Sequence, residues 1–183
     1  MTPRAVVLVE GRSDEIAVRT LARLRGRDLD AEGVSVLAVG GAQAMGRSLG
    51  ICGSAGANTT LAALCDRQEE PGVRRALERA GLSPAAGRAG PGRAGLFVCE
   101  RDLEDELVRG LGVAATEAVL RAHGKLGAFR TYQKQPAHRT RPTSDQLRGF
   151  LNNWKVELAA ALVEALDPSR VPRPLDGVLA YVP

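Results

Sequence analysis

The stretch AVVLVEGRSDEIAV, residues 5–18, decides the fold that we expect for the whole chain. Its first half is a run of apolar and β-branched residues that ends just before Gly11, which is the pattern of a buried strand. Its second half has apolar residues at helical spacing, and Ser13 is in position to cap that helix. The stretch therefore predicts a strand over residues 4–9 and a helix that ends near Arg25. Glu10 stands between the two, and Asp14 follows four residues later.

The same strand-and-helix pattern returns three more times before residue 113. Strands are expected at residues 33–39, 59–66 and 95–100, and helices are expected just after Gly41, at residues 71–81 and from residue 102. Residues 50–58 and 83–95 have the Gly-rich composition of loops. Such alternation is typical of an α/β fold, here a mainly parallel sheet of about four strands flanked by helices.

Beyond residue 112 the strand pattern stops. Helical periodicity is found in residues 115–135 and 151–166, and a proline-punctuated turn precedes a short last helix. We therefore expect two domains, an α/β domain over residues 1–112 and a helical C-terminal extension over residues 113–183. The alternative is that the extension packs back on the sheet.

The composition is that of an ordinary globular protein. Of 183 residues, 44% are hydrophobic and 25% are charged, which excludes disordered and collagen-like classes. The sequence has neither an apolar run of membrane-spanning length nor a signal-peptide pattern, so a cytoplasmic protein is expected. The three cysteines have no paired metal-binding spacing and are expected to be reduced and buried. The net charge of +4 hints at an anionic partner.

Acidic residues follow three of the four expected strands. Ligands of an open parallel sheet bind at the carboxyl ends of its strands, so these side chains are expected to converge there. Convergence of carboxylates is costly unless a cation neutralises them, and Mg²⁺ or Mn²⁺ suits oxygen ligands. The residues concerned are Glu10, Asp66, Glu100, Asp102 and Glu104.

Several of these acids, and Asp14 as well, also have a simpler interpretation. Asp14, Asp102 and Glu104 lie in first turns of helices, where a carboxylate interacts favourably with the helix dipole. Asp66 could begin a turn by bonding its own backbone. Glu10 has neither explanation, because it precedes the expected cap and ends a buried strand.

Several familiar catalytic motifs are missing from the sequence. There is no Walker A motif, the glycines near Gly40 lack dinucleotide-binding spacing, and there is no nucleophile elbow. His123 and His138 stand in neither metal-binding nor triad spacing, and we expect both on the surface.

Four pieces of the sequence, taken together, resemble a known family. They are VVLVEGRSDEIAVRTLA, VLAVGGAQ, LAALCD and FVCERDLEDELVRGLG, in that order. Over residues 4–112 they resemble the Toprim domain carried by endonucleases of the OLD (overcoming lysogenisation defect) type. The chain is most similar to stand-alone Toprim proteins that lack an ATPase domain.

The resemblance implies a metal-dependent enzyme that cleaves nucleic-acid phosphodiesters with Mg²⁺ or Mn²⁺, using two metals in the OLD version. It implies catalytic roles for Glu10 and Lys155. One departure is found, because Gln68 stands where the family usually has a second aspartate, and this weakens the expectation of a second metal. The implied metal ligands are Glu10, Asp14, Asp66, Asp102 and Glu104.

A basic segment follows the α/β part. Between Arg121 and Arg148 there are seven Lys or Arg residues and one acid, with four aromatic residues in or beside the segment. This composition suits a nucleic-acid track in which bases stack on aromatic rings. The alternative is a solvated basic face over an aromatic core. The residues proposed for nucleic-acid binding are Arg130, Lys134, Arg139 and Arg141.

Three functions therefore remain open. The first is a nuclease acting on DNA or RNA. The second is a weak or inactive Toprim module that binds nucleic acid or a separately encoded ATPase, and Gln68 favours it. The third is a phosphohydrolase of small nucleotides. A homodimer is a further option, and no membrane partner is expected.

Overall fold

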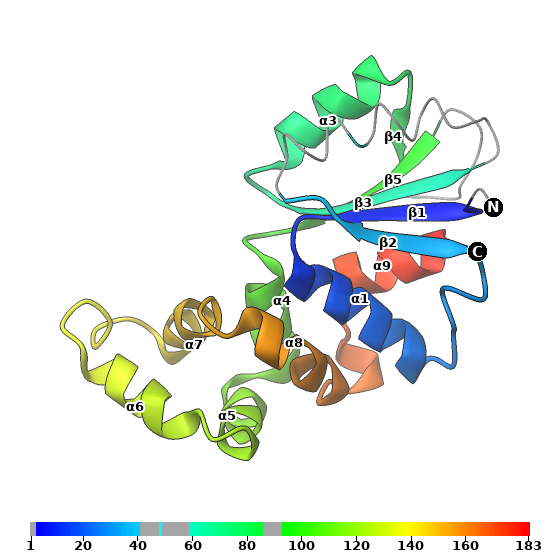
Figure 1. The fold of residues 1–183 in the computed structure, drawn as a ribbon. Helices are drawn as coiled ribbons and strands as arrows, with labels where there is room; N and C mark the ends of the chain where they lie inside the picture. Colours follow the sequence, from blue (N-terminus) through cyan, green and yellow to red (C-terminus); the bar gives the residue numbers. More distant parts are fainter. Residues whose placement is uncertain (1–2, 41–47, 49–58, 86–92) are drawn as a thin grey trace.

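The structure is a computed structural model that describes residues 3–40, 48, 59–85 and 93–183 (Figure 1). Its centre is a five-stranded parallel sheet with the strand order β2-β1-β3-β5-β4. The predicted α/β class with a parallel sheet is thus confirmed, with one strand more than expected. The strands are β1 (Ala5–Val9), β2 (Val34–Ala38), β3 (Thr60–Asp66), β4 (Ser83–Ala85) and β5 (Arg93–Cys99).

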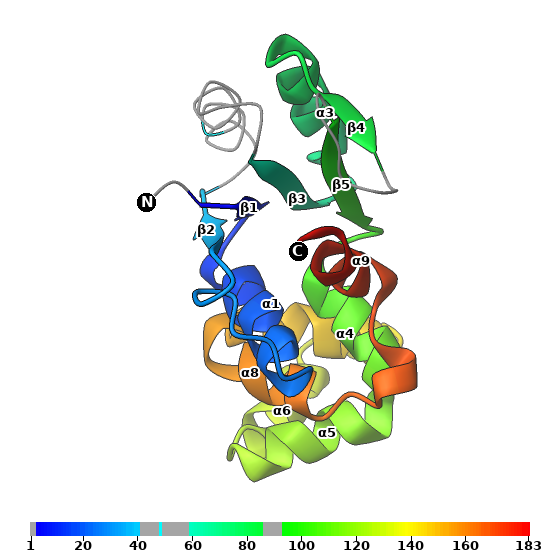
Figure 2. The same cartoon turned by 90° about the vertical axis from the view of Figure 1, so that its right-hand side faces the viewer.

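Both faces of the sheet are covered by helices (Figure 2). All five residues of β1 are buried, because Val7 and Val9 face one hydrophobic cluster while Val6 and Leu8 face another. Helix α3 (Glu70–Arg79) covers the second face. The first face is covered by α1 (Arg12–Leu24), α4 (Leu103–Leu111), α8 (Lys155–Glu164) and α9 (Arg173–Tyr181). An apolar run buried on both sides explains why the strand signal in residues 5–9 was continuous.

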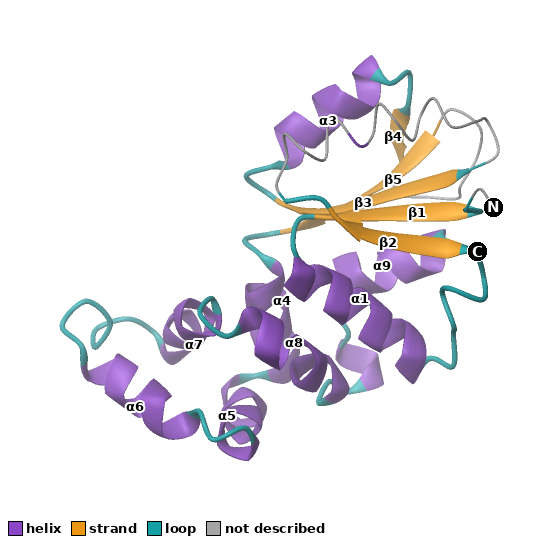
Figure 3. Cartoon of the chain, viewed as in Figure 1, coloured by secondary structure: helices purple, strands orange, loops and turns teal. Residues whose placement is uncertain are grey.

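The chain is helical from residue 113 onward, as expected (Figure 3). Helices α5 (Val113–Ala122), α6 (Leu126–Lys134) and α7 (Thr143–Leu151) form a group beyond the end of the sheet, and a short 3-10 helix, η1 (Pro168–Arg170), precedes α9. In the described part of the chain, no helix combines the length and the apolar character needed to cross a bilayer.

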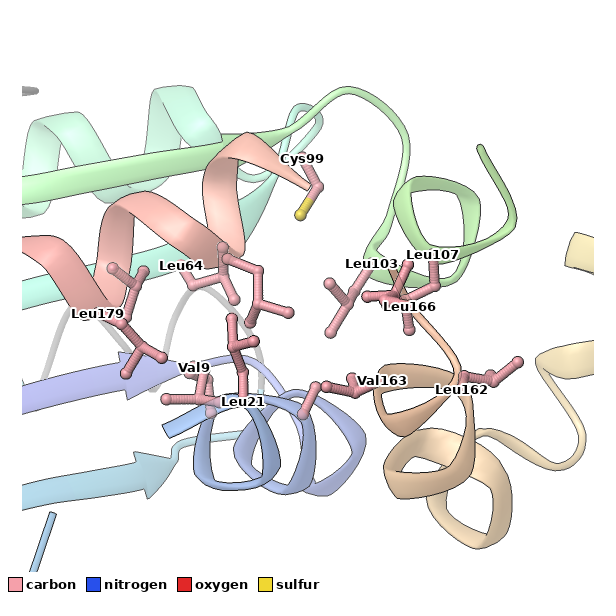
Figure 4. Packing of buried hydrophobic residues seen from close by; sticks show 14 of the residues in the cluster. Val9, Leu21, Leu64, Cys99, Leu103, Leu107, Leu162, Val163, Leu166 and Leu179 are labelled. Carbon is pink, nitrogen blue, oxygen red and sulfur yellow. The ribbon is translucent and has the colours of Figure 1, made fainter. Parts of the chain in front are cut away.

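Helices α8 and α9 pack back on the sheet. Val163 of α8 and Leu179 of α9 lie in the same cluster as Val9, Leu21 and Leu64 (Figure 4). The division at residue 112 coincides with the start of α5, so it marks a change of secondary structure. As a domain boundary it stays a prediction, since one hydrophobic cluster joins the two parts.

Three local predictions were wrong. Helix α1 begins at Arg12 with Gly11 as its N-cap, and Ser13 lies inside the helix with a buried side chain. Residues 83–85 form β4 instead of a loop, because they pair with β5 at the edge of the sheet. The helix expected from residue 151 begins at Lys155, since α7 ends at Leu151 and a turn separates the two helices. The helix expected after Gly41 and the loop at residues 50–58 lie outside the described residues.

Helix α9 is held against the sheet by close packing and by Arg27. The Arg27 guanidinium donates to the Leu179 carbonyl oxygen at 2.6 Å and pairs with Glu32 at 2.6 Å. The rings of Phe97 and Tyr181 meet edge to face, with centroids 5.8 Å apart. Helix α9 thus closes the face of the sheet over β3 and β5.

Gly177 is a position where α9 has no room for a side chain. A Cβ atom there would lie 2.6 Å from Cε1 of Phe97, a ring that is already packed against Tyr181. We expect Gly177→Ala to destabilise the protein by about 1–3 kcal/mol, because overpacking outweighs the better helix propensity of alanine. Chemical denaturation measures this difference.

Gly127 in α6 provides the matched control, since a Cβ atom there meets nothing within 4 Å. Gly127→Ala is expected to stabilise the protein by about 0.5–1 kcal/mol. Equal effects at the two positions would contradict the close approach of α9 to Phe97.

Candidate functional site

A hollow of about 400 Å³ lies where the carboxyl ends of β1 and β3 meet the starts of α1, α4 and α8. It brings together all six residues that were proposed as metal ligands or catalytic groups. Glu100, which also follows a strand, does not line it and instead pairs with Arg109 at 2.9 Å. The charged residues of the hollow are Glu10, Asp14, Asp66, Asp102, Glu104 and Lys155. We call these six residues and the hollow the acidic site.

Glu10 is fixed at the end of β1 by the neighbouring strand. Its Oε1 atom accepts a hydrogen bond from the backbone N–H of Asp66 at 2.7 Å. This contact arises because β1 and β3 are parallel neighbours in register from Ala5 with Thr60 to Val9 with Leu64, so both strands end side by side. The two acids that the sequence placed at separate strand ends therefore meet at one edge of the sheet.

Asp14 and Glu104 enter the site from two helix starts. The Asp14 Oδ2 atom accepts from the Gly11 N–H at 2.8 Å, which satisfies a backbone donor at the start of α1. Glu104 lies in the first turn of α4 and is only 5% exposed. The buried hydroxyl of Ser13 lies beside Glu104 and lowers its pKa, which partly opposes the effect of burial.

The carboxylates raise one another's pKa. The pKa of Asp66 rises from 3.8 to about 8, first because burial disfavours its charge and then because Glu10 and Asp102 repel it. The pKa of Asp14 rises to about 6, again through burial first and then through Glu104 and Glu10. Burial also raises the pKa values of Glu10 and Glu104. The acidic site therefore favours protons or a cation over four free negative charges.

Asp102 differs from the other acids because it already has partners. Its Oδ1 atom caps α4 by accepting from the Asp105 N–H at 2.8 Å, and its Oδ2 atom accepts from Arg148 Nε at 2.7 Å. The pairing with Arg148 joins α4 to α7 and raises the pKa of Arg148. Both alternatives considered for Asp102 are thus visible in its geometry, which combines a helix cap with a place in the acidic site.

The cap and the ion pair of Asp102 can be separated by mutation. Asp102→Ala removes both and is expected to cost about 2–3 kcal/mol of stability, because it leaves Arg148 without its partner. Asp102→Asn keeps an oxygen acceptor for the cap and is expected to cost about 1 kcal/mol less. Thermal and urea unfolding of the two variants measure the difference. Equal losses would contradict the capping role.

Lys155 reaches the site from the first position of α8. Its charge lowers the pKa values of Glu10, Asp14 and Glu104, partly opposing the effects of burial. A cation at a helix N-terminus interacts unfavourably with the helix dipole, so the carboxylates explain its position better than α8 does. Asn152, one turn earlier, also lines the site and was missed. The only signal for it in the sequence was its spacing of three residues from Lys155.

The donors of the site suit a hard divalent cation. All the titratable side chains of the site that can bind a metal ion are carboxylates, which are the ligands that Mg²⁺ and Mn²⁺ prefer. Within the described ranges, no three acidic, histidine or cysteine side chains already form a ligand set around one point. The chemistry of the site therefore fits a cation, and the carboxylates would have to turn toward it.

Gln68 does not take part in the acidic site. Its side chain is exposed and it does not line the hollow. Glu69, the N-cap of α3, instead adds to the charge that raises the pKa of Glu10. Glu70 is held by Arg67 and Arg74. Glu69 therefore acts on Glu10 through its charge but, like Gln68, does not line the hollow.

The basic segment has its aromatic rings turned inward. Phe129 and Phe150 are 0% and 4% exposed, with ring centroids 5.3 Å apart, so the expectation that bases stack on them is wrong. Lys125 lies 3.5 Å over the Trp154 ring, and Arg130 pairs with Glu117 at 2.6 Å. Lys134, Arg139 and Arg141 are exposed and have no ion pair within the described residues. Nucleic-acid binding by these four basic residues stays a prediction.

The comparison with family models agrees with this geometry. Residues 3–67 match the model described as "Overcoming lysogenization defect protein-like, TOPRIM domain". Over these residues the chain is similar to an OLD-like Toprim domain. The matched part of the Toprim domain includes Glu10, Asp14 and Asp66, whereas Asp102, Glu104 and Lys155 lie beyond it.

Solved structures of OLD proteins share the fold over nearly the whole chain. The C-terminal region of the Xanthomonas campestris pv. campestris OLD protein matches with 24% identity and a TM-score of 0.66, covering 97% of this chain and 93% of that one. The C-terminal region of the Burkholderia pseudomallei OLD protein matches with 17% identity and a TM-score of 0.65, covering 98% and 96%. At these identities the likeness shows the fold. The search of curated proteins gave no match.

Proposed function

We propose that this Toprim protein hydrolyses phosphodiester bonds in nucleic acid with the help of Mg²⁺ or Mn²⁺ held at the acidic site. OLD-like Toprim domains are generally related to nucleases, and Toprim domains generally bind divalent metals. The observation that carries the proposal for this chain is that five partly or fully buried carboxylates and one lysine share a single hollow.

The acidic residues have distinct roles in this proposal. Glu10, Asp14, Asp66 and Glu104 would hold the cation, and Asp102 would orient α4 and Arg148 beside them. When bound, the cation supplies Lewis-acid chemistry, which lowers the pKa of a water and stabilises charge on phosphoryl oxygens. The Asp66 N–H holds the Glu10 carboxylate in a fixed position.

Lys155 would act on the substrate. A phosphodiester gains negative charge as it is attacked, and a fixed ammonium group near that charge stabilises the transition state. The lysine carries no resident ion pair within the described residues, so its charge is available to a phosphate.

A second candidate is a Toprim module that binds nucleic acid, or a separately encoded ATPase, without cleaving. It is favoured by the exposed Gln68 and by the lack of a preformed ligand set among the described side chains. The buried, free Cys65 and Cys99 suit a reducing compartment, and we propose the cytoplasm for either function.

A cleavage assay distinguishes the two candidates. The protein is incubated with plasmid, linear duplex, single-stranded DNA and RNA, in Mg²⁺, Mn²⁺ or EDTA. Cleavage that requires a metal and is lost in Lys155→Ala supports the nuclease. Salt-sensitive binding without cleavage of any substrate, in either metal, overturns it in favour of the binding module.

A further inference from the structure

A second hollow, of about 560 Å³, lies next to the acidic site and has the opposite charge. Its walls come from the carboxyl ends of β3 and β5, from α4 and from the segment of residues 170–174 that leads into α9. We call it the arginine hollow. Its charged residues are Arg67, Arg109, Arg170, Arg173, Glu100 and Glu106.

The charges of the arginine hollow do not cancel. Glu100 and Glu106 both pair with Arg109, at 2.9 Å and 2.6 Å. Arg170 and Arg173 have no carboxylate partner within the described residues, and Arg170 makes only a 3.4 Å hydrogen bond to the Arg109 carbonyl oxygen. Two guanidinium groups are thus left to face an outside anion.

The backbone strengthens this positive character. Pro172 and Pro174 also line the hollow, so the positive end of the α9 dipole lies in its wall. Gly110 of α4 allows the segment to approach, because a Cβ atom there would lie 2.9 Å from the carbonyl oxygen of Arg170. Arg170 is therefore held close to α4 by a contact that only glycine permits.

The arginine hollow and the acidic site share two elements. Asp66 lines the acidic site and Arg67, the next residue, lines the arginine hollow, so the two sites meet at neighbouring residues at the end of β3. On α4, Glu104 lines the acidic site and Glu106 lines the arginine hollow. A nucleic-acid strand carries one phosphate about every 3.4 Å of helix axis, so a strand that crosses one site reaches the other within a few nucleotides.

We propose that the arginine hollow binds backbone phosphates of the nucleic-acid strand whose neighbouring phosphodiester lies at the acidic site. The proposal rests on the proposed function for its substrate class. Arg170 and Arg173 are the binding residues, and guanidinium groups suit them for phosphate recognition. A strand bound in both hollows would cross the carboxyl end of β3.

The test is binding of a labelled 12-nucleotide single strand in EDTA, so that cleavage does not enter the readout. Arg170→Ala/Arg173→Ala is expected to weaken binding about tenfold or more and to lower the slope of log affinity against log salt by about 1.4. Arg170→Lys/Arg173→Lys keeps both positive charges and is expected to retain most of the affinity. This variant therefore separates the effect of losing the charge from the effect of losing the fold. Circular dichroism and thermal melting check the fold of each variant.

Arg75→Ala/Arg79→Ala on α3 is the matched control, because it removes the same charge from exposed residues that line neither hollow. Binding by the Arg170/Arg173 variant that equals binding by this control overturns the inference and leaves the nuclease proposal standing. Strand binding that is weakened only in Arg139→Ala/Arg141→Ala also overturns the inference and assigns strand binding to the basic segment.

Two further outcomes separate this inference from the proposed function. A wild-type protein that binds no strand, or that binds a mononucleotide as tightly as the 12-mer, overturns the inference. Arginine-dependent binding by a protein that cleaves nothing in Mg²⁺ or Mn²⁺ supports the inference while the nuclease proposal fails.

Discussion

Replacing Glu10 with glutamine is expected to reduce metal-dependent cleavage about 1,000-fold while leaving the fold intact. The glutamine amide oxygen can still accept the 2.7 Å hydrogen bond from the Asp66 N–H, so the contact between the ends of β1 and β3 is kept. Only the negative charge is lost, and with it the proposed ligand for the cation. Single-turnover cleavage in Mn²⁺ measures the effect without interference from product release.

Glu78→Gln provides the control for Glu10. It makes the same chemical change at an exposed carboxylate of α3, away from both hollows, and is expected to cleave like the wild type. Cleavage by Glu10→Gln at the rate of Glu78→Gln would remove Glu10 from the catalytic site. Equal loss in both variants would point to a general effect of charge on substrate binding.

Asp66→Asn is expected to make the metal-free protein more stable at pH 8 even though it removes a proposed metal ligand. The pKa of Asp66 is raised from 3.8 to about 8, so the folded protein holds a proton that the unfolded chain has released. The wild type therefore loses stability as the pH rises from about 4 to about 8. Asparagine removes this loss, and we expect a gain of about 1–2 kcal/mol for a partly exposed side chain.

The measurement is unfolding in urea with EDTA at pH values from 4 to 8. The free energy of unfolding of the wild type should fall as the pH rises across this range, and Asp14 contributes to this fall up to its raised pKa of about 6. The free energy of unfolding of Asp66→Asn should depend less on pH. Adding Mn²⁺ at pH 8 should raise the melting temperature of the wild type more than that of the variant. An Asp66→Asn protein that is less stable than wild type at pH 8 would show that the carboxylates do not repel one another.

The sequence predicted the sheet and the acids at its edge because both are local signals. The run in residues 5–9 is buried on both faces and so reads as a strand without help from tertiary contacts. Glu10 and Asp66 could be placed together because neighbouring parallel strands end at one edge. Lys155 came from the family resemblance alone, since nothing in residues 151–166 marks it as part of a site 145 positions after Glu10.

What the sequence missed depends on contacts between distant segments. Strand β4 is only three residues long and exists because β5 offers it a partner. The partner of Asp102 is Arg148, 46 residues later, and the arginine hollow needs residues 67, 109 and 170–174 together. The inward turn of Phe129 and Phe150 is likewise a matter of which helix face meets the core. None of these contacts can be predicted from a local sequence pattern.

The return of α9 to the sheet has a consequence for folding during synthesis. Strands β1, β3 and β5 leave the ribosome well before residues 173–181, yet Leu64 and Phe97 stay uncovered until α9 arrives. Because the closing contacts join segments far apart in the chain, the sheet cannot reach its final stability while translation of this segment is still in progress. A ribosome stalled before residue 173 would therefore carry an open apolar face, which makes the nascent chain a client for chaperones.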